Sequence, residues 1–178
     1  MKLYTTIIHT VLGEVFVAAS NESLYVLEFD NPARRAAHIQ HITKELNCSV
    51  EETTNPILQQ TEAELHEYLN RTRTHFTIPI TMIGTNFQKT VWSALQNIPY
   101  GTTISYEELS HQIGNPLAIR AVGTANGQNK IAIIIPCHRV VNKSGGLGGF
   151  GGGLHRKEFL LKLENASFGS TTNQETLF

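Results

Sequence analysis

The sequence predicts an α+β protein. A small antiparallel sheet with helices is expected in the N-terminal part, and a mostly helical, winged helix-turn-helix-like domain in the C-terminal part. Short segments rich in β-branched and aromatic residues come first, and segments with helical periodicity and capping signals follow. The 178 residues are enough for two small domains. We expect an N-terminal domain with its linker at residues 1–84, a C-terminal domain at residues 85–167 and a disordered tail at residues 168–178.

Strands and helices are both indicated in the first part. Three segments with strand character, separated by turn-forming residues, predict an antiparallel meander: Leu3–Ile8, Glu14–Ala19 and Leu24–Phe29. Two helices are expected to begin at Asn31-Pro32 and Asn55-Pro56, because proline suits the first position of a helix. The histidines here have no carboxylate or thiol at ligand spacing. We interpret them as surface residues and expect no chemistry before residue 80.

The second part predicts a series of helices. One begins at Thr85 or Asn86 and ends before Pro99. Another begins at the capping box Ser105-x-x-Glu108. The turn Gly114-Asn115-Pro116 predicts a third over Leu117–Asn126, capped by Asn115. This order is the helix-turn-helix pattern, although any helical hairpin looks similar. Apart from Arg120, the third helix is almost entirely small residues, which allows close approach to a DNA backbone or equally to another helix.

The segment from Ile131 to Val141 contains the candidate nucleophile. The strand-like apolar run Ile131–Ile135 leads through Pro136 to Cys137, His138 and Arg139. A cysteine in an apolar run is more often part of a core than a catalyst. A thiol beside an imidazole is nevertheless the composition of an activated nucleophile. Glu164, on a closing helix expected over about Leu154–Asn165, is the candidate carboxylate to orient His138, and an ordinary solvated charge is the alternative.

Seven of the nine residues in Gly145–Gly153 are glycine. Within this segment, Gly146-x-Gly148-x-x-Gly151 matches the dinucleotide-binding fingerprint. We reject that interpretation, because no strand and crossover follow to build a nucleotide-binding sheet. A glycine-rich loop that lets backbone approach a ligand, or that wraps a pocket, is expected instead.

Composition and charge restrict the class of protein. The chain is 40% hydrophobic and 16% charged, and its net charge of −1 argues weakly against a nucleic-acid partner. Residues 1–84 carry six basic and ten acidic side chains, whereas residues 85–178 carry eight and five. The basic second half is compatible with phosphate binding or with an ordinary solvated surface.

No segment is long and apolar enough to span a membrane, and the N-terminus lacks a signal-peptide pattern. Two cysteines favour a cytoplasmic protein with reduced thiols and no structural zinc.

The hexapeptide Pro136–Val141 resembles the signature of the O6-alkylguanine-DNA alkyltransferases, DNA-repair proteins also called methylated-DNA–protein-cysteine methyltransferases. Further matches follow in the family's order and spacing over about residues 85–165: Phe87-Gln88-x-x-Val91-Trp92, Pro99-Tyr100-Gly101, Ser105-Tyr106, Gly114-Asn115-Pro116, Arg120–Gly123, Asn126, Asn129 and Gly152-Gly153-Leu154-x-x-Lys157. The N-terminal part matches only in its layout, which the resemblance interprets as a ribonuclease H-like support domain.

The resemblance implies stoichiometric, irreversible DNA repair. Cys137 would take the alkyl group, typically methyl, from O6-alkylguanine and keep it as a thioether, with O4-alkylthymine as a further candidate substrate. The base must leave the double helix to reach the thiol. The implied partner is double-stranded DNA, contacted in the minor groove by a monomer. No cofactor is implied, since the alkyl donor is the DNA, so the glycine loop is not an S-adenosylmethionine site.

The resemblance also assigns roles to residues. His138 would be the base, linked to Cys137 through water, and Glu164 its orienting carboxylate. Tyr106 would aid flipping and donate a proton or hydrogen bond to the base, and Asn129 would brace the turn. Arg120 would fill the gap left by the base. The other expected DNA-binding residues are Ala121, Thr124, Ala125 and Asn126. The expected pocket residues are Arg139, Val140, Phe150 and Gly151. The backbone near Cys137 and Val140 would accept a hydrogen bond from the guanine amino group.

Two departures from the family pattern matter. Phe150 and Gly151 stand where some members have Tyr-Ser, so only backbone N–H groups are expected near the alkylated oxygen, in a roomier loop. The zinc-binding cysteines of some relatives are missing, and we predict no metal.

A cysteine at position 137 argues against the alkyltransferase-like members that only bind lesions. The other classes considered are a winged-helix DNA-binding regulator with a buried cysteine and a cysteine hydrolase using Cys137 and His138.

Overall fold

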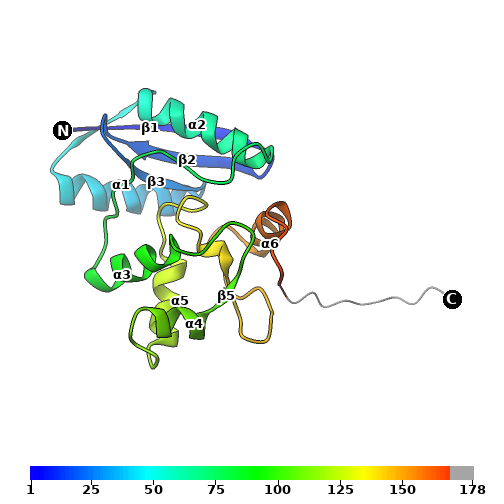
Figure 1. The fold of residues 1–178 in the computed structure, drawn as a ribbon. Coiled ribbons are helices and arrows are strands. Elements are labelled where there is room, and N and C mark those ends of the chain that lie inside the picture. The colour runs from blue at the N-terminus through cyan, green and yellow to red at the C-terminus, as the bar shows by residue number, and fades with distance from the viewer. Residues whose placement is uncertain (169–178) are drawn as a thin grey trace.

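The computed structural model describes residues 1–168 of the chain. A sheet flanked by helices forms the N-terminal part, and a mostly helical C-terminal part lies against it (Figure 1). This arrangement confirms the predicted α+β class. In the described residues, no helix is both long and apolar enough to cross a membrane.

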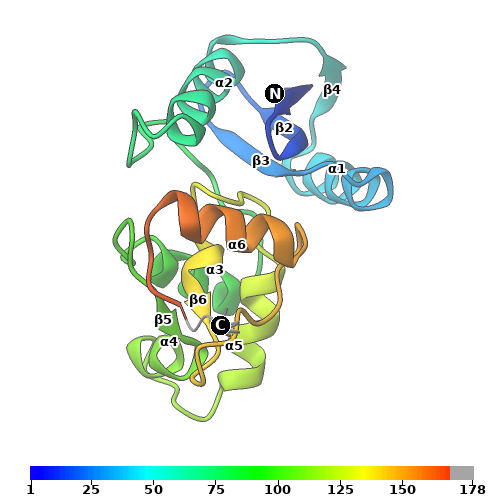
Figure 2. The ribbon, with the colours of Figure 1, turned by 90° about the vertical axis from the view of Figure 1, so that its right-hand side faces the viewer.

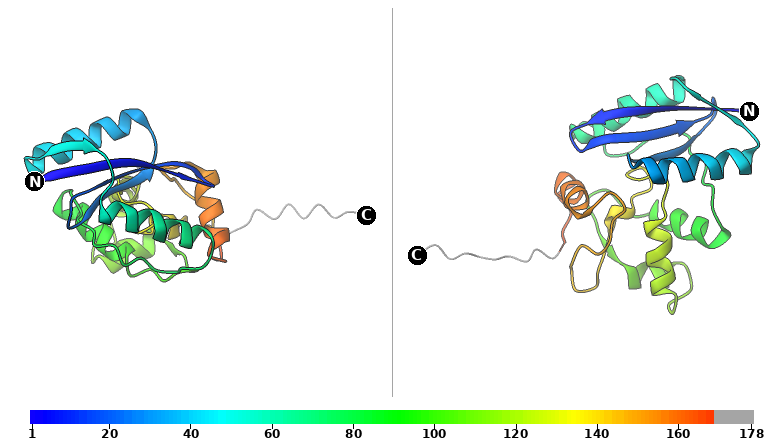
Figure 3. Two further views of the ribbon diagram at one scale, coloured as in Figure 1. Left: turned by 90° about the horizontal axis from the view of Figure 1, so that it is seen from above. Right: turned by 180° about the vertical axis from the view of Figure 1, so that it is seen from behind.

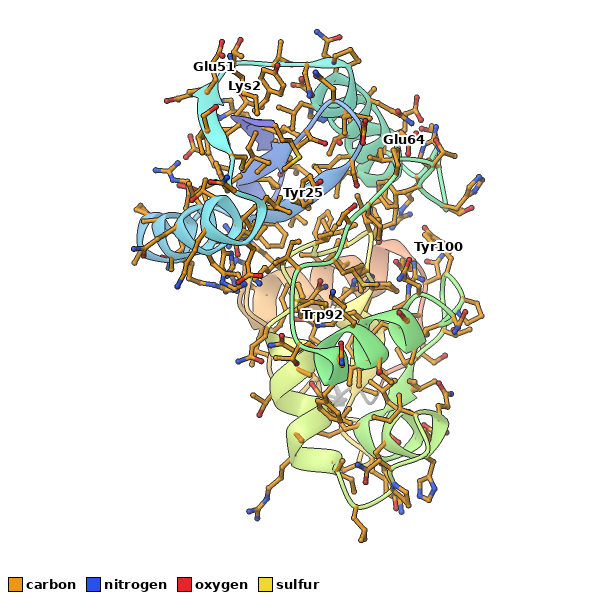
Figure 4. The ribbon with its side chains drawn as sticks, turned by 90° about the vertical axis from the view of Figure 1, so that its left-hand side faces the viewer. Lys2, Tyr25, Glu51, Glu64, Trp92 and Tyr100 are labelled. Atoms are coloured by element: carbon orange, nitrogen blue, oxygen red, sulfur yellow. The ribbon has the colours of Figure 1, made fainter. Side chains whose placement is uncertain are left out.

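The N-terminal sheet contains the three predicted strands and one more. Strands β1 (Lys2–Thr10), β2 (Gly13–Ala19) and β3 (Leu24–Phe29) pair antiparallel, as expected. Strand β4 (Ser49–Glu52) pairs parallel to β1, giving the order β3-β2-β1-β4. The predicted antiparallel sheet is therefore wrong in this respect, because the sheet is mixed. All four residues of β4 are exposed, so the strand has no hydrophobic alternation that the sequence could show. Lys2 Nζ meets Glu51 Oε2 across the pair at 2.5 Å (Figure 4).

Two helices cover opposite faces of the sheet (Figure 3, left). Helix α1 (Pro32–Leu46) begins where the Asn31 side chain accepts from the Arg34 N–H, and α2 (Pro56–Leu69) where Asn55 accepts from the Leu58 N–H. Both starts were predicted from the Asn-Pro pairs. The α1 face carries a small apolar cluster around Ile42 and Phe16. The α2 face belongs to a larger cluster that continues into the C-terminal part.

The C-terminal part follows the predicted helix order with two changes. Helix α3 (Asn86–Leu95) has a capping box formed by Thr85 and Gln88, and α4 (Tyr106–Gln112) has the predicted Ser105–Glu108 box. Helix α5 (Ile119–Gly127) begins later than expected and has no side-chain cap. The backbone bond from Ala118 N to Asn115 O (3.0 Å) closes a separate turn first. Leu117 in that turn is 96% exposed, so no packing holds an earlier helical turn.

The apolar run before the cysteine is buried, but it is not a strand. Ile131 alone forms a bridge, to Leu27 of β3, and the chain then turns, with Ile133 in the left-handed region at φ 70°. The Asn129 side chain holds this turn by accepting from Ile131 N (3.0 Å) and donating to Ile135 O (2.8 Å). These side-chain bonds replace the ladder that a strand would need.

A 3₁₀ helix, η1 (Cys137–Arg139), follows the turn and leads into β6 (Val140–Val141), which pairs parallel to β5 (Ile104–Ser105). The last helix, α6 (Leu154–Leu163), lies at the edge of the C-terminal part that faces the sheet (Figure 2). It ends two residues before the expected boundary, with Glu164 as its C-cap. Phe168, the first residue of the expected tail, packs near Leu161 and Ala166, and residues 169–178 lie outside the described residues.

Candidate functional site

Cys137 is the first residue of η1 and is 5% exposed. Its position is fixed through the backbone. The Cys137 N–H donates to Ile135 O (2.8 Å), and Asn126 of α5 donates from Nδ2 to Cys137 O (3.3 Å). Asn129, which braces the preceding turn, also lies at the thiol, and its hydrogen bond acts to lower the pKa of Cys137. The helix α5 and the apolar turn therefore together hold the thiol in place.

Glu164 is the centre of a buried hydrogen-bond network behind the thiol. Its Oε1 accepts from His138 Nε2 (2.8 Å), from Arg139 Nη2 (2.9 Å) and from the Tyr68 hydroxyl (2.5 Å). Its Oε2 accepts from Arg139 Nε (2.9 Å) and from Gly101 N (3.1 Å). Glu164 is 3% exposed and His138 is fully buried. The structure thus brings together His138 and Glu164, which are 26 residues apart in sequence.

The network fixes the protonation states. Burial alone would raise the pKa of Glu164, but hydrogen bonds from His138 and Arg139 and the charges of those groups outweigh it and hold the pKa well below its ordinary value. Glu164 is therefore a carboxylate and can only accept hydrogen bonds. His138 Nε2 must carry the hydrogen, which leaves Nδ1 as the free lone pair of a neutral ring.

The thiol and the imidazole are both neutral at rest. Burial raises the pKa of the Cys137 thiol, against smaller lowering effects from Asn129 and Lys157. Burial also lowers the pKa of His138, against the raising effect of Glu164. The two side chains make no direct hydrogen bond, as expected for sequence neighbours, and His138 Nδ1 is buried without a partner among the described residues. A base with a free nitrogen therefore lies close to a protonated thiol.

A pocket of about 870 Å³ opens beside α5. It is lined by Tyr106, Arg120, Gly123, Asn126, Phe150 and Gly151, among others. Cys137 lies in a smaller cavity that shares Asn126, Phe150 and Gly151 with this pocket. The thiol therefore lines a small cavity that adjoins the pocket beside α5.

Tyr106 and the glycine loop form one wall of that pocket. The Tyr106 hydroxyl lies 3.5 Å from Gly149 O, and a Cβ on Gly148 would come within 2.9 Å of the ring. Burial raises the pKa of Tyr106, and negative charge on Cys137 raises it further. The phenol is therefore a proton or hydrogen-bond donor facing the pocket, not a phenolate.

Lys157 holds the glycine loop against the strand that follows the cysteine. It is fully buried, and its Nζ donates to Val140 O (2.6 Å) and Gly149 O (3.2 Å). Burial lowers its pKa to about 8. The sequence analysis named Lys157 only as part of a motif and assigned it no role. Its position on an otherwise apolar face of the predicted helix was the signal that could have indicated a buried, functional lysine.

Some of the expected DNA-binding and pocket residues face elsewhere. Arg120, Ala121 and Thr124 are exposed on α5. Ala125 and Asn126 are buried, because Trp92 Nε1 donates to Ala125 O (2.8 Å) and Asn126 bonds Cys137 O. Both residues therefore anchor α5 to the core, and Asn126 also lines the pocket, so their expected contact with DNA stays a prediction.

The two residues after His138 also differ from the expectation. Arg139 was expected to line the pocket, but its side chain points to Glu164 and to Ile98 O (2.6 Å). Val140 is fully buried, and Lys157 already donates to its carbonyl. In contrast, Phe150 and Gly151 do line the pocket, as predicted.

The N-terminal part contributes to the site, contrary to the expectation of no chemistry before residue 80. Tyr68 of α2 bonds Glu164, and Arg34 of α1 donates from Nη1 to Gly151 O (3.2 Å). His38, interpreted as a surface residue, is partly buried, and its Nδ1 lies 2.7 Å from Glu28 Oε1. The sequence predicted the two helices but gave Tyr68 and Arg34 no role, because only the packing of the two parts shows which side chains reach the site.

Comparison with known proteins identifies the class to which this fold and site correspond. A family model described as the DNA binding domain of 6-O-methylguanine DNA methyltransferase matches residues 86–166, and one described as its ribonuclease-like domain matches residues 3–82. The two matches define a class of two-part proteins, with a ribonuclease-like first domain and a second domain of the DNA-binding type. The chain belongs to the 6-O-methylguanine DNA methyltransferase family.

Individual relatives agree. The chain is 38% identical over 164 residues to a methylated-DNA–protein-cysteine methyltransferase of Methanosarcina acetivorans, covering 92% of this chain and 99% of the relative. It is 53% identical over 103 residues to the Mycobacterium tuberculosis protein of the same name, a match that spans 58% of this chain and 62% of the relative. The crystal structure of Mycobacterium tuberculosis OGT in complex with DNA superposes with a TM-score of 0.77, at 38% identity and 93% coverage of both chains.

Proposed function

We propose that this protein repairs DNA by moving the alkyl group of O6-alkylguanine onto Cys137. The observation that carries the proposal is the position of the thiol. Cys137 lines a small cavity that adjoins the pocket beside α5, with the neutral base His138 and its partner Glu164 buried beside it. The printed names of the relatives, methylated-DNA–protein-cysteine methyltransferases, support the same reaction.

The proposed transfer is a single displacement. Cys137 Sγ forms a bond to the alkyl carbon as the bond between that carbon and guanine O6 breaks. The thiol proton passes, through the water link that the family resemblance implies, to His138 Nδ1, the buried nitrogen that the Glu164 hydrogen bond leaves without a proton. Guanine leaves with the bonding electron pair and takes a proton or hydrogen bond from Tyr106, whose phenol is protonated in the pocket. Glu164 stabilises the imidazolium that forms.

The reaction consumes the protein. A thioether at Cys137 is a stable product, and this step involves no group that would remove it. One molecule therefore repairs one lesion. The alkyl donor is the DNA, so the proposed step uses no cofactor. All the residues assigned to the step come from one chain, and we propose a monomer as the working unit.

The proposed DNA-binding surface is the exposed side of α5. Arg120 lies at the rim of the pocket, at the first turn of the helix. Small neighbours such as Ala121 and Gly123 allow the helix to come close to the minor groove of double-stranded DNA. An extruded guanine would then enter the pocket between Tyr106 and Phe150. The Mycobacterium tuberculosis relative has been crystallised in complex with DNA.

Peptide mass spectrometry tests the proposal directly. The protein is incubated with duplex DNA containing one O6-methylguanine, and peptides carrying Cys137 and Cys48 are compared. We expect one methyl group on Cys137 for each lesion removed and none on Cys48. Cys48 is half-buried on the face of the sheet that α1 covers, away from the site. An intact lesion with unmodified Cys137 would refute the proposal.

The variant Cys137→Ser separates the other classes of function. The proposed transferase loses all transfer but keeps its affinity for the lesion. A DNA-binding regulator would instead show binding to a particular sequence and no methylation of the native protein. A cysteine hydrolase would show repeated turnover on an acyl ester, whereas the proposed reaction stops after one event per molecule.

A further inference from the structure

Tyr68 brings a buried hydroxyl from the N-terminal part into the acid–base network. It lies near the end of α2, is fully buried, and donates to Glu164 Oε1 across 96 residues of sequence. Packing fixes its ring edge-on to Tyr100, at 6.1 Å and 88° between the rings, and beside Phe76 at 5.3 Å. Tyr100 lies just below the N-terminal part in Figure 4, so the contact is at the junction of the two parts.

Tyr68 and His138 share the same oxygen atom. Glu164 Oε1 accepts three hydrogen bonds, from His138 Nε2, Arg139 Nη2 and the Tyr68 hydroxyl. A carboxylate oxygen has about two lone pairs, so a third donor reduces the electron density available to each of the others. The hydroxyl therefore competes with the imidazole for the charge that would stabilise a protonated His138.

We propose that Tyr68 is a positioning residue of the alkyl-transfer site, whose hydroxyl weakens the hold of Glu164 on the protonated form of His138. The proposal rests on the proposed transfer of the alkyl group to Cys137. The N-terminal part then does more than support the fold, because it keeps the base in the neutral form that accepts the thiol proton.

The effect of removing the hydroxyl follows from the remaining charges. In Tyr68→Phe, Glu164 Oε1 keeps only His138 and Arg139 as donors, so its negative charge is less dispersed and the pKa of His138 rises. Arg139 and Lys157, which lower the pKa of His138, are unchanged, as are the Cys137 thiol and the Tyr100 phenol. Burial raises the pKa of Tyr68 well above its ordinary value, so the native hydroxyl stays a neutral donor throughout.

The first test is the pH dependence of Cys137 methylation by duplex DNA containing O6-methylguanine. Rates are measured for the native protein, Tyr68→Phe and Tyr100→Phe. We expect the acidic limb of the profile to move to higher pH by about one unit in Tyr68→Phe, as a change in one hydrogen bond to a charged group allows. Tyr100→Phe is the matched control, because within the described part of the chain its hydroxyl donates only to the backbone oxygen of Leu163, at 3.4 Å. A profile of Tyr68→Phe that differs only by a uniform rate factor would overturn the proposal.

The second test needs no DNA. The imidazole of His138 is titrated by NMR in the native protein, in Tyr68→Phe and in protein with 3-fluorotyrosine at position 68, whose hydroxyl is a stronger donor. We expect the titration to move to higher pH in the first variant and to lower pH in the second. An unchanged titration in both variants sinks the inference even if the native protein repairs DNA. Failure of the native protein to be methylated counts against the proposed function alone. The fluorinated residue keeps the hydroxyl, so it carries the test if Tyr68→Phe unfolds.

Discussion

At the scale of single residues, the site depends on one fully hydrogen-bonded carboxylate. Glu164 accepts five hydrogen bonds from four residues, namely Tyr68 of α2, Gly101 of a turn, and His138 and Arg139 of η1. Among residues 1–168, it is also the only acidic partner of the buried Arg139. Such a group orients His138 and at the same time neutralises a cation in the core. Its replacement should therefore affect both chemistry and stability.

The variant Glu164→Gln tests this dual role. It leaves Arg139 as a buried charge without a counter-charge, and breaking a buried ion pair costs about 3–5 kcal/mol. We expect the free energy of unfolding, measured with urea at neutral pH, to fall by that amount. Glu158→Gln is the matched control, because Glu158 pairs only with exposed Lys162 at 2.8 Å on α6. Equal effects of the two substitutions would contradict the importance of burial.

The same two residues predict how stability depends on pH. The pKa values of His138 and Glu164 are both lowered on folding, so each group contributes stability that is present above its unfolded pKa and lost as pH falls through its folded pKa. Thermal melting should show that stability begins to fall below pH 6.5, the ordinary pKa of histidine. It should fall further below pH 4.5, the ordinary pKa of glutamate. In Glu164→Gln the second decrease should become shallower. Stability that rises on acidification through this range would refute the assignment.

At the scale of elements, the glycine loop is shaped around Tyr106. Gly148 has φ 70°, and a Cβ there would lie 2.9 Å from the Tyr106 ring and hydroxyl and 3.2 Å from Asn142 Oδ1. A glycine is thus required both by the backbone and by the neighbour. The next residue, Gly149, has nothing within 4 Å of the same position and a permitted φ.

Gly148→Ala and Gly149→Ala form a matched pair for this loop. An alanine in the left-handed region costs about 1–2 kcal/mol, and the contact with Tyr106 adds to it. We expect Gly148→Ala to lower the melting temperature and to slow methylation of Cys137 by about tenfold, since a 1.4 kcal/mol change in barrier corresponds to about that factor. Gly149→Ala should retain both properties. Similar losses in the two variants would show that the loop tolerates no side chain anywhere, independent of Tyr106.

Helix α5 should act on duplex DNA more than on the chemical step. Arg120 is exposed at its first turn and lies at the rim of the pocket, away from the thiol. We expect Arg120→Ala to slow repair of O6-methylguanine in duplex DNA strongly, by about tenfold or more for the loss of a charged contact. The reaction with the free base O6-benzylguanine should be much less affected. Lys162→Ala removes an equal charge from α6 and should change neither rate. Equal losses of Arg120→Ala on both substrates would contradict a role in base extrusion.

At the scale of the whole molecule, one apolar core joins the two parts. The largest cluster contains Leu65 of α2, Leu27 of β3 and Ile131 of the turn before the cysteine, together with Trp92 of α3. The bridge between Leu27 and Ile131 continues this contact in the backbone. The two halves are therefore expected to unfold as a unit.

Leu65→Ala tests that coupling. Leu65 is fully buried in the N-terminal part, and a Leu to Ala change in a core costs about 2–5 kcal/mol. The only tryptophan, Trp92, reports on the C-terminal part. We expect tryptophan fluorescence and far-ultraviolet circular dichroism to show the same lowered midpoint in urea. Val11→Ala, at a residue 73% exposed, should leave the midpoint within experimental error. A Trp92 transition that stays at the native midpoint would show two independent units.

The sequence by itself determined most of the local structure and singled out Cys137 as the candidate nucleophile. Asn-Pro pairs and capping boxes located the helix starts, because those signals act within one turn of the chain. Motif order around Cys137 and His138 identified the family and predicted the reaction, since the candidate reacting groups are close in sequence. The same local rules were wrong for the start of α5 and for β4, where a backbone turn and a parallel pairing with β1 decided the outcome.

Only the tertiary structure decided what surrounds the reacting groups. Tyr68, Arg34 and Gly101 reach the site from 63 to 117 residues away in sequence. Arg139, expected at the pocket, turns instead toward Glu164, and Asn126, which lines the pocket, also bonds the Cys137 backbone. The physical reason is that burial makes each polar group take a hydrogen-bond partner from whichever element packs against it, and no sequence spacing encodes that partner.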